Sequence, residues 1–200
     1  RWTSHAALRM PRVTTAFAAA FALFLPIGRP LLVGLTPAVG IGAGLLTTQA
    51  AYSMSAEDWF DSGVAKAKRG DWQGAIADWT KVIEINPRFA DAYSNRGVAK
   101  DELEDYQAAI ADFNKAIEIK PRDDDVYYNR GSAKGELKDY QGAIADYTKA
   151  IQINPALRQA YINRGIDLEI VGDPQGACSD WRKAVDLGHP YAIAWVRKNC

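Results

Sequence analysis

The chain has 200 residues, of which 48% are hydrophobic and 24% are charged, a composition typical of one globular domain with an appendage. Its formal net charge is zero, but residues 1–55 contain arginines and no acidic residue, so residues 56–200 carry all 24 acidic side chains and a net charge of −4. A mildly acidic domain argues against nucleic-acid binding, which relies on basic side chains that neutralise phosphates. The change of composition near Ser55 predicts an apolar segment over 1–55 and a folded domain over 56–200.

The N-terminal segment is apolar enough to span or contact a membrane. Residues 13–28 and 30–56 are uncharged over 16 and 27 positions, and a spanning helix needs about 20 apolar residues. Three interpretations are open: an export signal that is cleaved near Ala50 and Ala51, a retained anchor of one span or a hairpin, and a retained extended tail. The glycines and prolines of residues 30–48 favour the tail. We therefore expect residues 13–53 to contact a membrane or a hydrophobic protein surface.

The folded domain repeats itself every 34 residues. Residues 105–121 read DYQAAIADFNKAIEIKP, and residues 139–155 read DYQGAIADYTKAIQINP. Three of the columns that align at this spacing are Gly63, Gly97, Gly131 and Gly165; Asp71, Asp105, Asp139 and Asp173; and the aromatic Trp79, Phe113, Tyr147 and Trp181. The columns divide the domain into four repeats, 56–89, 90–123, 124–157 and 158–191.

Each repeat predicts two antiparallel helices. In the second repeat, residues 90–103 favour a helix, Asp105 supplies a capping side chain, and apolar residues at 109, 110, 113, 116 and 117 form a stripe on a second helix. Pro121 ends that helix, because proline cannot continue the hydrogen-bond ladder. Gly97 and Ala109 are expected to be small so that the two helices can approach closely. One pair cannot bury its own apolar face, so the four pairs are expected to stack.

Glycine, alanine and aromatic positions at this spacing, with a closing proline, resemble the tetratricopeptide repeat over residues 56–191. The resemblance implies an all-α solenoid of four helix-turn-helix repeats with a capping helix over 190–200. It also implies a non-enzymatic scaffold that binds protein partners.

The amino-acid sequence of the repeats allows a more specific expectation about the kind of protein and its location. The stretches YSNRGVAK and DYQGAIADYTKAI resemble repeats of cyanobacterial and plastid proteins. This second resemblance implies an assembly or stabilising subunit of a photosynthetic (thylakoid) membrane complex. The alternative is a soluble adaptor that binds peptides in a lumen or periplasm after removal of the N-terminal segment.

The first helices of tetratricopeptide repeats line a groove, so the resemblance implies a partner-binding set there. The set is Phe60, Asp61, Ser94, Asn95, Val98, Tyr128, Asn129, Ser132, Ile162, Asn163 and Ile166. Its asparagines recur every 34 residues and would suit the backbone of an extended peptide, because an amide both donates and accepts hydrogen bonds. The alternative is that they are consensus residues of the repeat. Only Asn95 matches the carboxylate clamp of chaperone-binding relatives, so that mode of binding is not expected.

Two charged patterns also recur with the repeat. Arg96, Arg130 and Arg164 each precede a glycine of the repeat column, and we expect them to be solvated or paired within their own repeats. Asp78 with Lys81, and the equivalent residues of the next two repeats, lie three positions apart. That spacing predicts ordinary surface pairs on one helix.

The sequence offers little for catalysis or metal binding. The two histidines, His5 and His189, have no serine or cysteine in a triad pattern, and no Cys/His cluster has metal-ligand spacing. No catalytic residue, metal or cofactor is therefore predicted.

The two cysteines are placed for a disulfide. Cys178 and Cys200 lie 11 residues on either side of His189, so both would lie at similar heights on two antiparallel helices joined by a turn at 188–190. The alternative is a buried Cys178 and a free terminal Cys200. A disulfide would indicate an oxidising compartment such as a periplasm or a thylakoid lumen.

Overall fold

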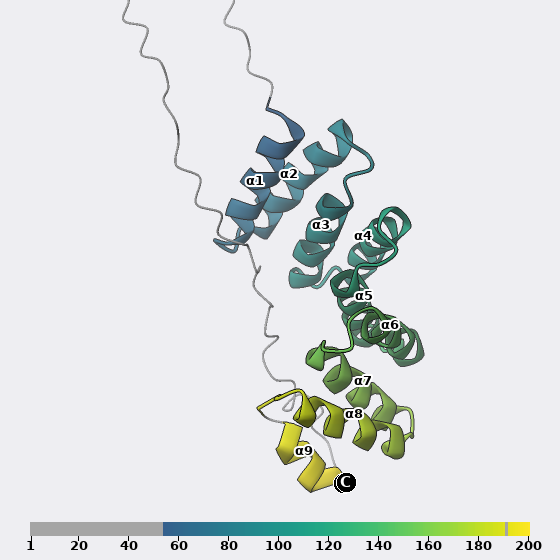
Figure 1. Ribbon diagram of the computed structural model, residues 1–200. Helices are drawn as coiled ribbons and strands as arrows, with labels where there is room; N and C mark the ends of the chain where they lie inside the picture. Colours follow the sequence, from purple (N-terminus) through teal and green to yellow (C-terminus); the bar gives the residue numbers. More distant parts are fainter. Residues whose placement is uncertain (1–53, 191) are drawn as a thin grey trace, which may run out of the picture. The chain divides into compact units, whose positions relative to one another are not determined.

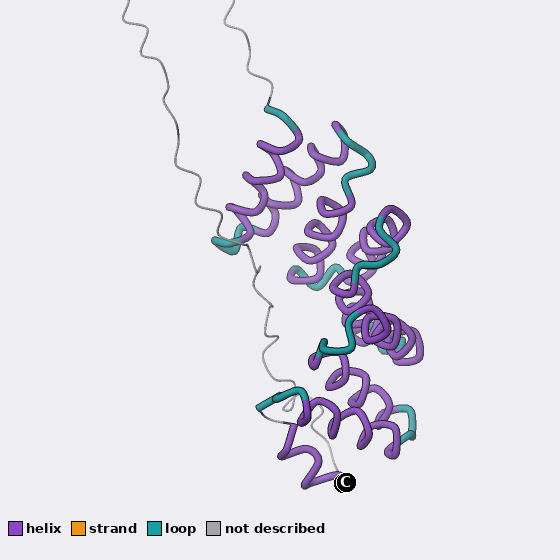
Figure 2. The backbone as a smooth tube through the Cα atoms, viewed as in Figure 1, coloured by secondary structure: helices purple, strands orange, loops and turns teal. Residues whose placement is uncertain are grey.

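The computed structural model describes residues 54–190 and 192–200, and these residues form helices joined by turns (Figure 2). The segment 1–53 lies outside the described residues, so the signal, anchor and tail interpretations stay predictions. In the described part, none of the helices combines the length and the apolar character that crossing a bilayer requires.

The helices form four consecutive pairs and a shorter last helix (Figure 1). The pairs are α1 (Ala56–Ala67) with α2 (Trp72–Ile85), α3 (Ala90–Glu102) with α4 (Tyr106–Ile119), α5 (Asp124–Glu136) with α6 (Tyr140–Ile153), and α7 (Arg158–Ile170) with α8 (Pro174–Asp186). The last helix, α9 (Ala192–Asn199), packs on α8. Each helix contacts the next one along the chain, which is the predicted solenoid of helix pairs with a C-terminal cap.

The turn inside each pair has the same construction. Its last residue is an aspartate whose carboxylate accepts a hydrogen bond from the backbone N–H three residues later, and these caps are Asp71, Asp105, Asp139 and Asp173. Such a cap contributes about 1 kcal/mol to helix stability. The residue before each cap has a positive φ, including the non-glycine residues Glu104 (62°) and Lys138 (65°). The chain therefore reverses direction at the same point in every repeat.

Close packing within each pair depends on a glycine opposite an aromatic ring. A Cβ atom on Gly97 would lie 2.7 Å from Cε1 of Phe113, and one on Gly63 would lie 2.6 Å from Nε1 of Trp79. Phe113 and Ala109 are completely buried. The prediction that Gly97 and Ala109 are small because the helices approach closely is confirmed.

Candidate partner-binding surface

A buried ionic network sets the positions of the first helices. Arg96 on α3 donates to both carboxylate oxygens of Asp112 on α4, at 2.8 and 2.7 Å, and Lys100 lies 2.8 Å from the same carboxylate. The third nitrogen of the guanidinium, Nη1, donates to Thr80 of the preceding repeat at 3.0 Å. Asp112 is 4% exposed, and a buried carboxylate needs such partners to offset its lost hydration.

The network recurs along the repeats. Its members are Arg130, Lys134, Asp146 and Asn114 in the next interval, and Arg164, Asp180 and Thr148 in the last one. Each arginine also lies over a tyrosine ring of its own helix, with the guanidinium carbon 5.4–5.7 Å from the ring centroid. One guanidinium therefore joins the two helices of its repeat to each other and to the repeat before.

The network confirms one charged prediction and overturns another. Arg96, Arg130 and Arg164 pair within their repeats, as expected. The surface pairing of Asp78 with Lys81 is wrong: Asp78 binds Ser62 at 2.6 Å and Lys66 at 2.8 Å, whereas Lys81 pairs with Glu84 at 2.8 Å. The same holds for the pair Asp112 and Lys115, since Lys115 binds Glu118. The physical reason is that the aspartate column faces the neighbouring first helix rather than water.

Most of the predicted binding residues keep part of their side chain exposed on the first helices. Those that are half-buried or exposed are Phe60, Asp61, Ser94, Asn95, Val98, Tyr128, Asn129, Ser132, Asn163 and Ile166, and we call this set the first-helix surface. Helix α3 contacts α5, and α5 contacts α7, in addition to their contacts with the helices between them. The residues of these three helices therefore lie on neighbouring elements, as a partner that crosses several repeats would require.

Ile162 does not belong to this surface. Its side chain is only 5% exposed and belongs to a hydrophobic cluster with Tyr161 and Trp181, against which Trp195 and Val196 of α9 also pack. Ile162 is therefore buried by the last repeat and its cap in this structure, and its contact with a partner stays a prediction.

The chemistry of the first-helix surface changes along its length. At the N-terminal end, the rings of Phe60 and Phe89 stack with centroids 5.1 Å apart. Toward the C-terminal end, the side-chain amide of Asn163 donates to the Tyr128 hydroxyl at 3.2 Å, and the Tyr128 ring lies 5.8 Å from that of Tyr147. An aromatic end and a hydroxyl-rich end would favour different side chains of a bound segment.

Tyr147 lies beneath this surface, at 3% exposure, and sequence reasoning missed its contacts with surface residues. It lies on the second helix α6, yet it hydrogen-bonds with Asn163 and Ser132 of two first helices. Burial raises the pKa of Tyr147 far above its usual range, with Asp167 and Tyr128 adding to the increase and the two hydrogen bonds opposing it. The phenol therefore stays neutral. The signal was present in the sequence, because Tyr147 supplies the hydroxyl in an aromatic column otherwise made of Trp79, Phe113 and Trp181.

Two of the three asparagines that recur every 34 residues have side-chain amides with free hydrogen-bonding capacity. Within the described part of the chain, the side chains of Asn95 and Asn129 form no hydrogen bond, whereas Asn163 is bound to Tyr128. Both are half-buried, so each amide would gain a partner from a bound chain without losing an existing one. The arrangement can hold a peptide group, since each amide presents a donor and an acceptor.

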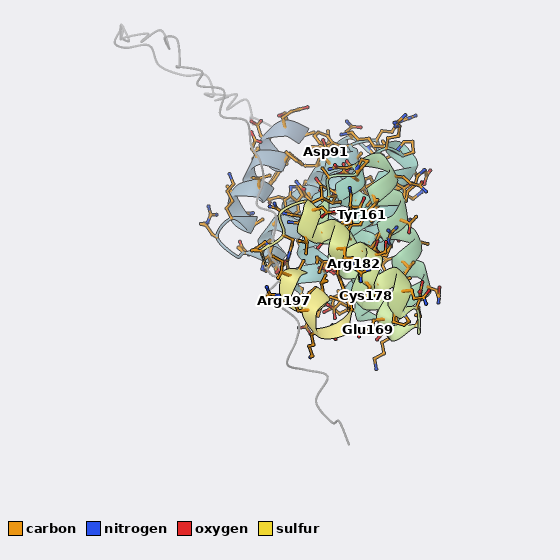
Figure 3. All side chains as sticks on the ribbon, turned by 60° about the horizontal axis from the view of Figure 1, so that its bottom comes forward. Asp91, Tyr161, Glu169, Cys178, Arg182 and Arg197 are labelled. Carbon is orange, nitrogen blue, oxygen red and sulfur yellow. A yellow bond between two sulfur atoms is a disulfide. The ribbon has the colours of Figure 1, made fainter. Side chains whose placement is uncertain are left out.

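A second feature that the sequence did not indicate lies between α8 and α9. A shallow cleft there is lined by Arg182, Val185 and Asp186 from α8 and by Ile193, Val196 and Arg197 from α9. Figure 3 labels Arg182 and Arg197 on these two helices. Ile193 is 48% exposed, so the lining combines exposed apolar surface with charged side chains.

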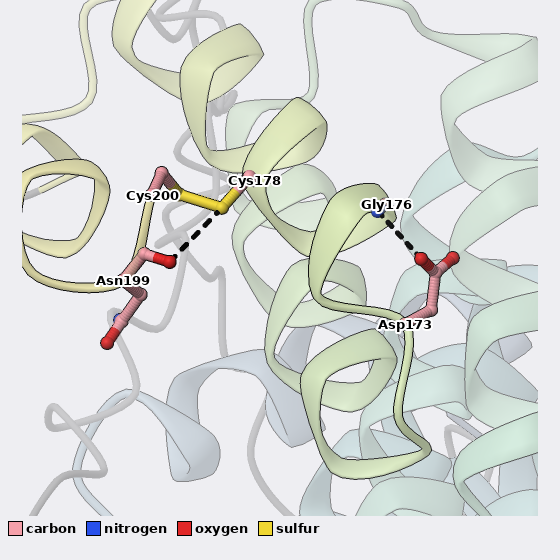
Figure 4. The surroundings of a disulfide bond; sticks show 5 residues. All are labelled: Asp173, Gly176, Cys178, Asn199 and Cys200. Atoms are coloured by element: carbon pink, nitrogen blue, oxygen red, sulfur yellow. Dashed lines mark hydrogen bonds between the residues drawn. A yellow bond between two sulfur atoms is a disulfide. The ribbon is translucent and has the colours of Figure 1, made fainter.

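The structure joins Cys178 of α8 to Cys200 by a disulfide, with the two Cα atoms 5.7 Å apart (Figure 4). This is the bonded one of the two alternatives that the sequence left open. In the residues for which positions are described, no three His, Cys, Asp or Glu side chains are grouped so that they could hold a metal ion.

Two family models match the sequence. The tetratricopeptide repeat model matches residues 90–123 and 124–157, and a second model, described as TPR repeat, matches residues 63–100. The first two matched ranges coincide with the second and third repeats defined by the 34-residue columns. No curated protein matches the sequence.

Solved structures with a similar fold include MamA and a plant domain. A crystal structure of MamA is 27% identical to this chain, covers 69% of it and 81% of the MamA chain, and has a TM-score of 0.65. The TPR domain of Arabidopsis OM64 is 29% identical, with coverages of 58% and 96% and a TM-score of 0.57. MamA from Desulfovibrio magneticus RS-1 is 22% identical, with coverages of 66% and 75% and a TM-score of 0.63, a likeness of fold alone.

Proposed function

The chain is a tetratricopeptide-repeat protein, and from that premise we propose that it is a non-enzymatic scaffold that binds an extended segment of a protein partner across its first-helix surface. Repeats of this kind are protein-interaction modules. The observation that carries the proposal is the pair of half-buried, unoccupied amides of Asn95 and Asn129 on the neighbouring helices α3 and α5. A bound backbone would satisfy both, because each amide can donate to a carbonyl and accept from an N–H.

The two ends of the surface would set the direction and the side chains of the bound segment. The stacked rings of Phe60 and Phe89 favour an apolar side chain at the N-terminal end. The hydroxyl groups of Tyr128 and Ser132, together with Asn163, favour a polar side chain at the other end. The rigid network of Arg96 and its equivalents supports this use, because it holds the first helices in position before a partner arrives.

We further propose that the scaffold acts at a membrane. In this proposal the N-terminal segment attaches the scaffold to a membrane complex. The resemblance of the repeat sequences to those of cyanobacterial and plastid proteins favours a photosynthetic membrane. A single span would keep the basic residues Arg1, Arg9 and Arg12 on the stromal or cytoplasmic side and the repeats in a lumen or periplasm. The disulfide supports an oxidising compartment of this kind. The same disulfide suits the alternative, a soluble exported adaptor from which the N-terminal segment has been removed.

The test of the binding surface replaces the two free amides. We expect the full chain to recover a partner by affinity capture from its native membranes, and the variant Asn95→Ala/Asn129→Ala to lose it. The matched control is Lys115→Ala, because Lys115 lies on a second helix and is exposed. Thermal unfolding should be unchanged in both variants. Equal capture by the wild type and the double variant would refute the proposed surface.

The test of the attachment is the N-terminal residue of the mature protein in membrane and soluble fractions. Recovery of the intact segment with membranes is expected for the scaffold. A protein that begins near Met54 and occurs only in the soluble fraction would reject the attached scaffold in favour of the exported adaptor.

A further inference from the structure

Helix α9 is held mainly by α8 and by one covalent bond. It has eight residues, and an isolated helix of that length is not stable in water. Its neighbour in the chain is α8, against which it packs, and the rings of Trp181 and Trp195 meet edge to face with centroids 6.0 Å apart. The stability of α9 therefore depends on its attachment to the last repeat.

The disulfide spans this contact. Cys178 lies on α8, with 8% of its surface exposed, at the position that is Ile76, Ile110 and Ile144 in the other repeats. Cys200 directly follows α9 and is exposed. The carbonyl oxygen of Asn199 also lies 3.5 Å from Cys178 Sγ (Figure 4), a close contact rather than a hydrogen bond, because a disulfide sulfur carries no proton. The bond therefore prevents α9 from leaving α8.

The cap changes the end of the first-helix surface. At the position of Ile162, the three earlier repeats have Phe60, Ser94 and Tyr128, and each of these side chains is partly exposed. Ile162 is buried in the one repeat that α9 covers, within the cluster on which Trp195 packs. The cap thus removes from the surface a side chain that the repeat pattern places there.

We propose that the Cys178–Cys200 disulfide is a redox latch on the C-terminal end of the first-helix surface. In the oxidised protein α9 is fixed and Ile162 is closed off. In the reduced protein α9 detaches, and Ile162 extends the binding surface by one apolar position. The regulatory meaning of the latch rests on the proposed function, because the surface that it closes is the one assigned to the partner.

The opening step is an exchange with a dithiol. One thiolate of the dithiol attacks the sulfur of Cys200, which is an exposed residue, forms a mixed disulfide, and releases the Cys178 thiolate, which takes up a proton. The second thiol of the dithiol then attacks the mixed disulfide and frees Cys200. In total, two electrons and two protons pass from the dithiol to the two cysteines, and the reagent leaves as its own disulfide.

Hydrogen exchange of the full chain tests the latch without any partner. We expect the backbone amides of α9 to exchange about tenfold faster, or more, after treatment with dithiothreitol, while those of α3 and α5 stay unchanged. Cys200→Ser should show the fast exchange with and without the reductant, and it alters only an exposed residue at the end of the described helices. Slow exchange of α9 in the reduced wild type or in Cys200→Ser would overturn the latch.

Partner binding tests the regulatory part separately. A partner recovered in the capture experiment should bind the oxidised wild type and Cys200→Ser with different affinities, and Ile162→Ser should abolish that difference. Equal affinities together with fast α9 exchange in Cys200→Ser would overturn the control of binding by the latch. Loss of the dependence on Asn95 and Asn129 would instead refute the proposed surface, and it leaves the exchange result unaffected.

Discussion

Removing the charge of one buried carboxylate is the sharpest test of the ionic network. Asp112 is 4% exposed, and its oxygens bind Arg96 and Lys100, whose side chains are 16% and 21% exposed. Asp112→Asn keeps the shape of the side chain but leaves two cations without a counter-charge. Removing one partner of a buried pair costs about 3–5 kcal/mol. Because both cations keep some contact with water, we expect the low end, about 3 kcal/mol.

The matched control is an exposed pair in the same repeat. Asp91 and Lys120 lie 2.6 Å apart, with side chains 49% and 52% exposed, and Asp91→Asn should cost less than about 1 kcal/mol. Thermal unfolding followed by circular dichroism would show the difference, since 3 kcal/mol corresponds to about 6–12 °C for a protein of this size.

A third variant separates the charge from the packing. The combination Arg96→Met, Lys100→Met and Asp112→Leu should recover most of the stability that Asp112→Asn loses, because it leaves no unpaired charge. Equal losses for Asp112→Asn and Asp91→Asn would show that the buried network does not stabilise the repeats in the way described.

Three further predictions concern packing, the disulfide and pH. Gly97→Ala should destabilise the chain by about 1–2 kcal/mol, because its Cβ would press on the ring of Phe113, whereas Gly135→Ala has room and should stabilise α5 by up to about 1 kcal/mol in urea unfolding. Cys200→Ser should lower the free energy of local unfolding of α8 and α9 by about 3 kcal/mol and abolish any effect of dithiothreitol on the melting temperature; a reductant effect that persists in this variant would contradict the assignment. Burial lowers the pKa of His189, with Arg158 adding to the effect. The free energy of unfolding should therefore keep its full value above the ordinary histidine pKa, and it should fall as the pH drops from there toward the lower pKa of His189 in the folded protein. His189→Gln should flatten that part of the pH–stability curve, and an unchanged slope would exclude His189 as its cause.

The arrangement of the helices was predictable because the repeated residues are packing constraints. Gly97 must be small where Phe113 fills the interface, and Asp105 must cap the helix that follows it. Such requirements act between residues close in sequence, and their fourfold recurrence makes the pattern recognisable within this one chain. The wrong prediction of the Asp112–Lys115 pair also has a physical cause. A spacing of three residues shows that the two side chains lie on the same side of a helix. It does not show which of them faces the neighbouring helix.

The candidate surface was predictable only in part. The register of the repeat located the first-helix positions, including Asn95 and Asn129, because every repeat has the same helix orientation. It could not show that Tyr147 of a second helix lies directly beneath the surface, or that Ile162 is buried in the cluster on which α9 packs. Both depend on contacts between one repeat and the next element of the chain, and the last repeat is the place where the periodic pattern ends.

The contact of each arginine with the preceding repeat has a consequence for the duplication or deletion of whole repeats. Arg96 and Arg130 each find a hydroxyl or amide oxygen on the preceding repeat, Thr80 or Asn114, so a duplicated or deleted interior unit would meet a compatible neighbour on both sides. The first repeat has Ser62 in place of the arginine, and the last has Leu168 in place of the lysine. We therefore expect the insertion of a whole repeat to preserve this network in the interior, whereas the first and last described repeats each lack one of its charged residues.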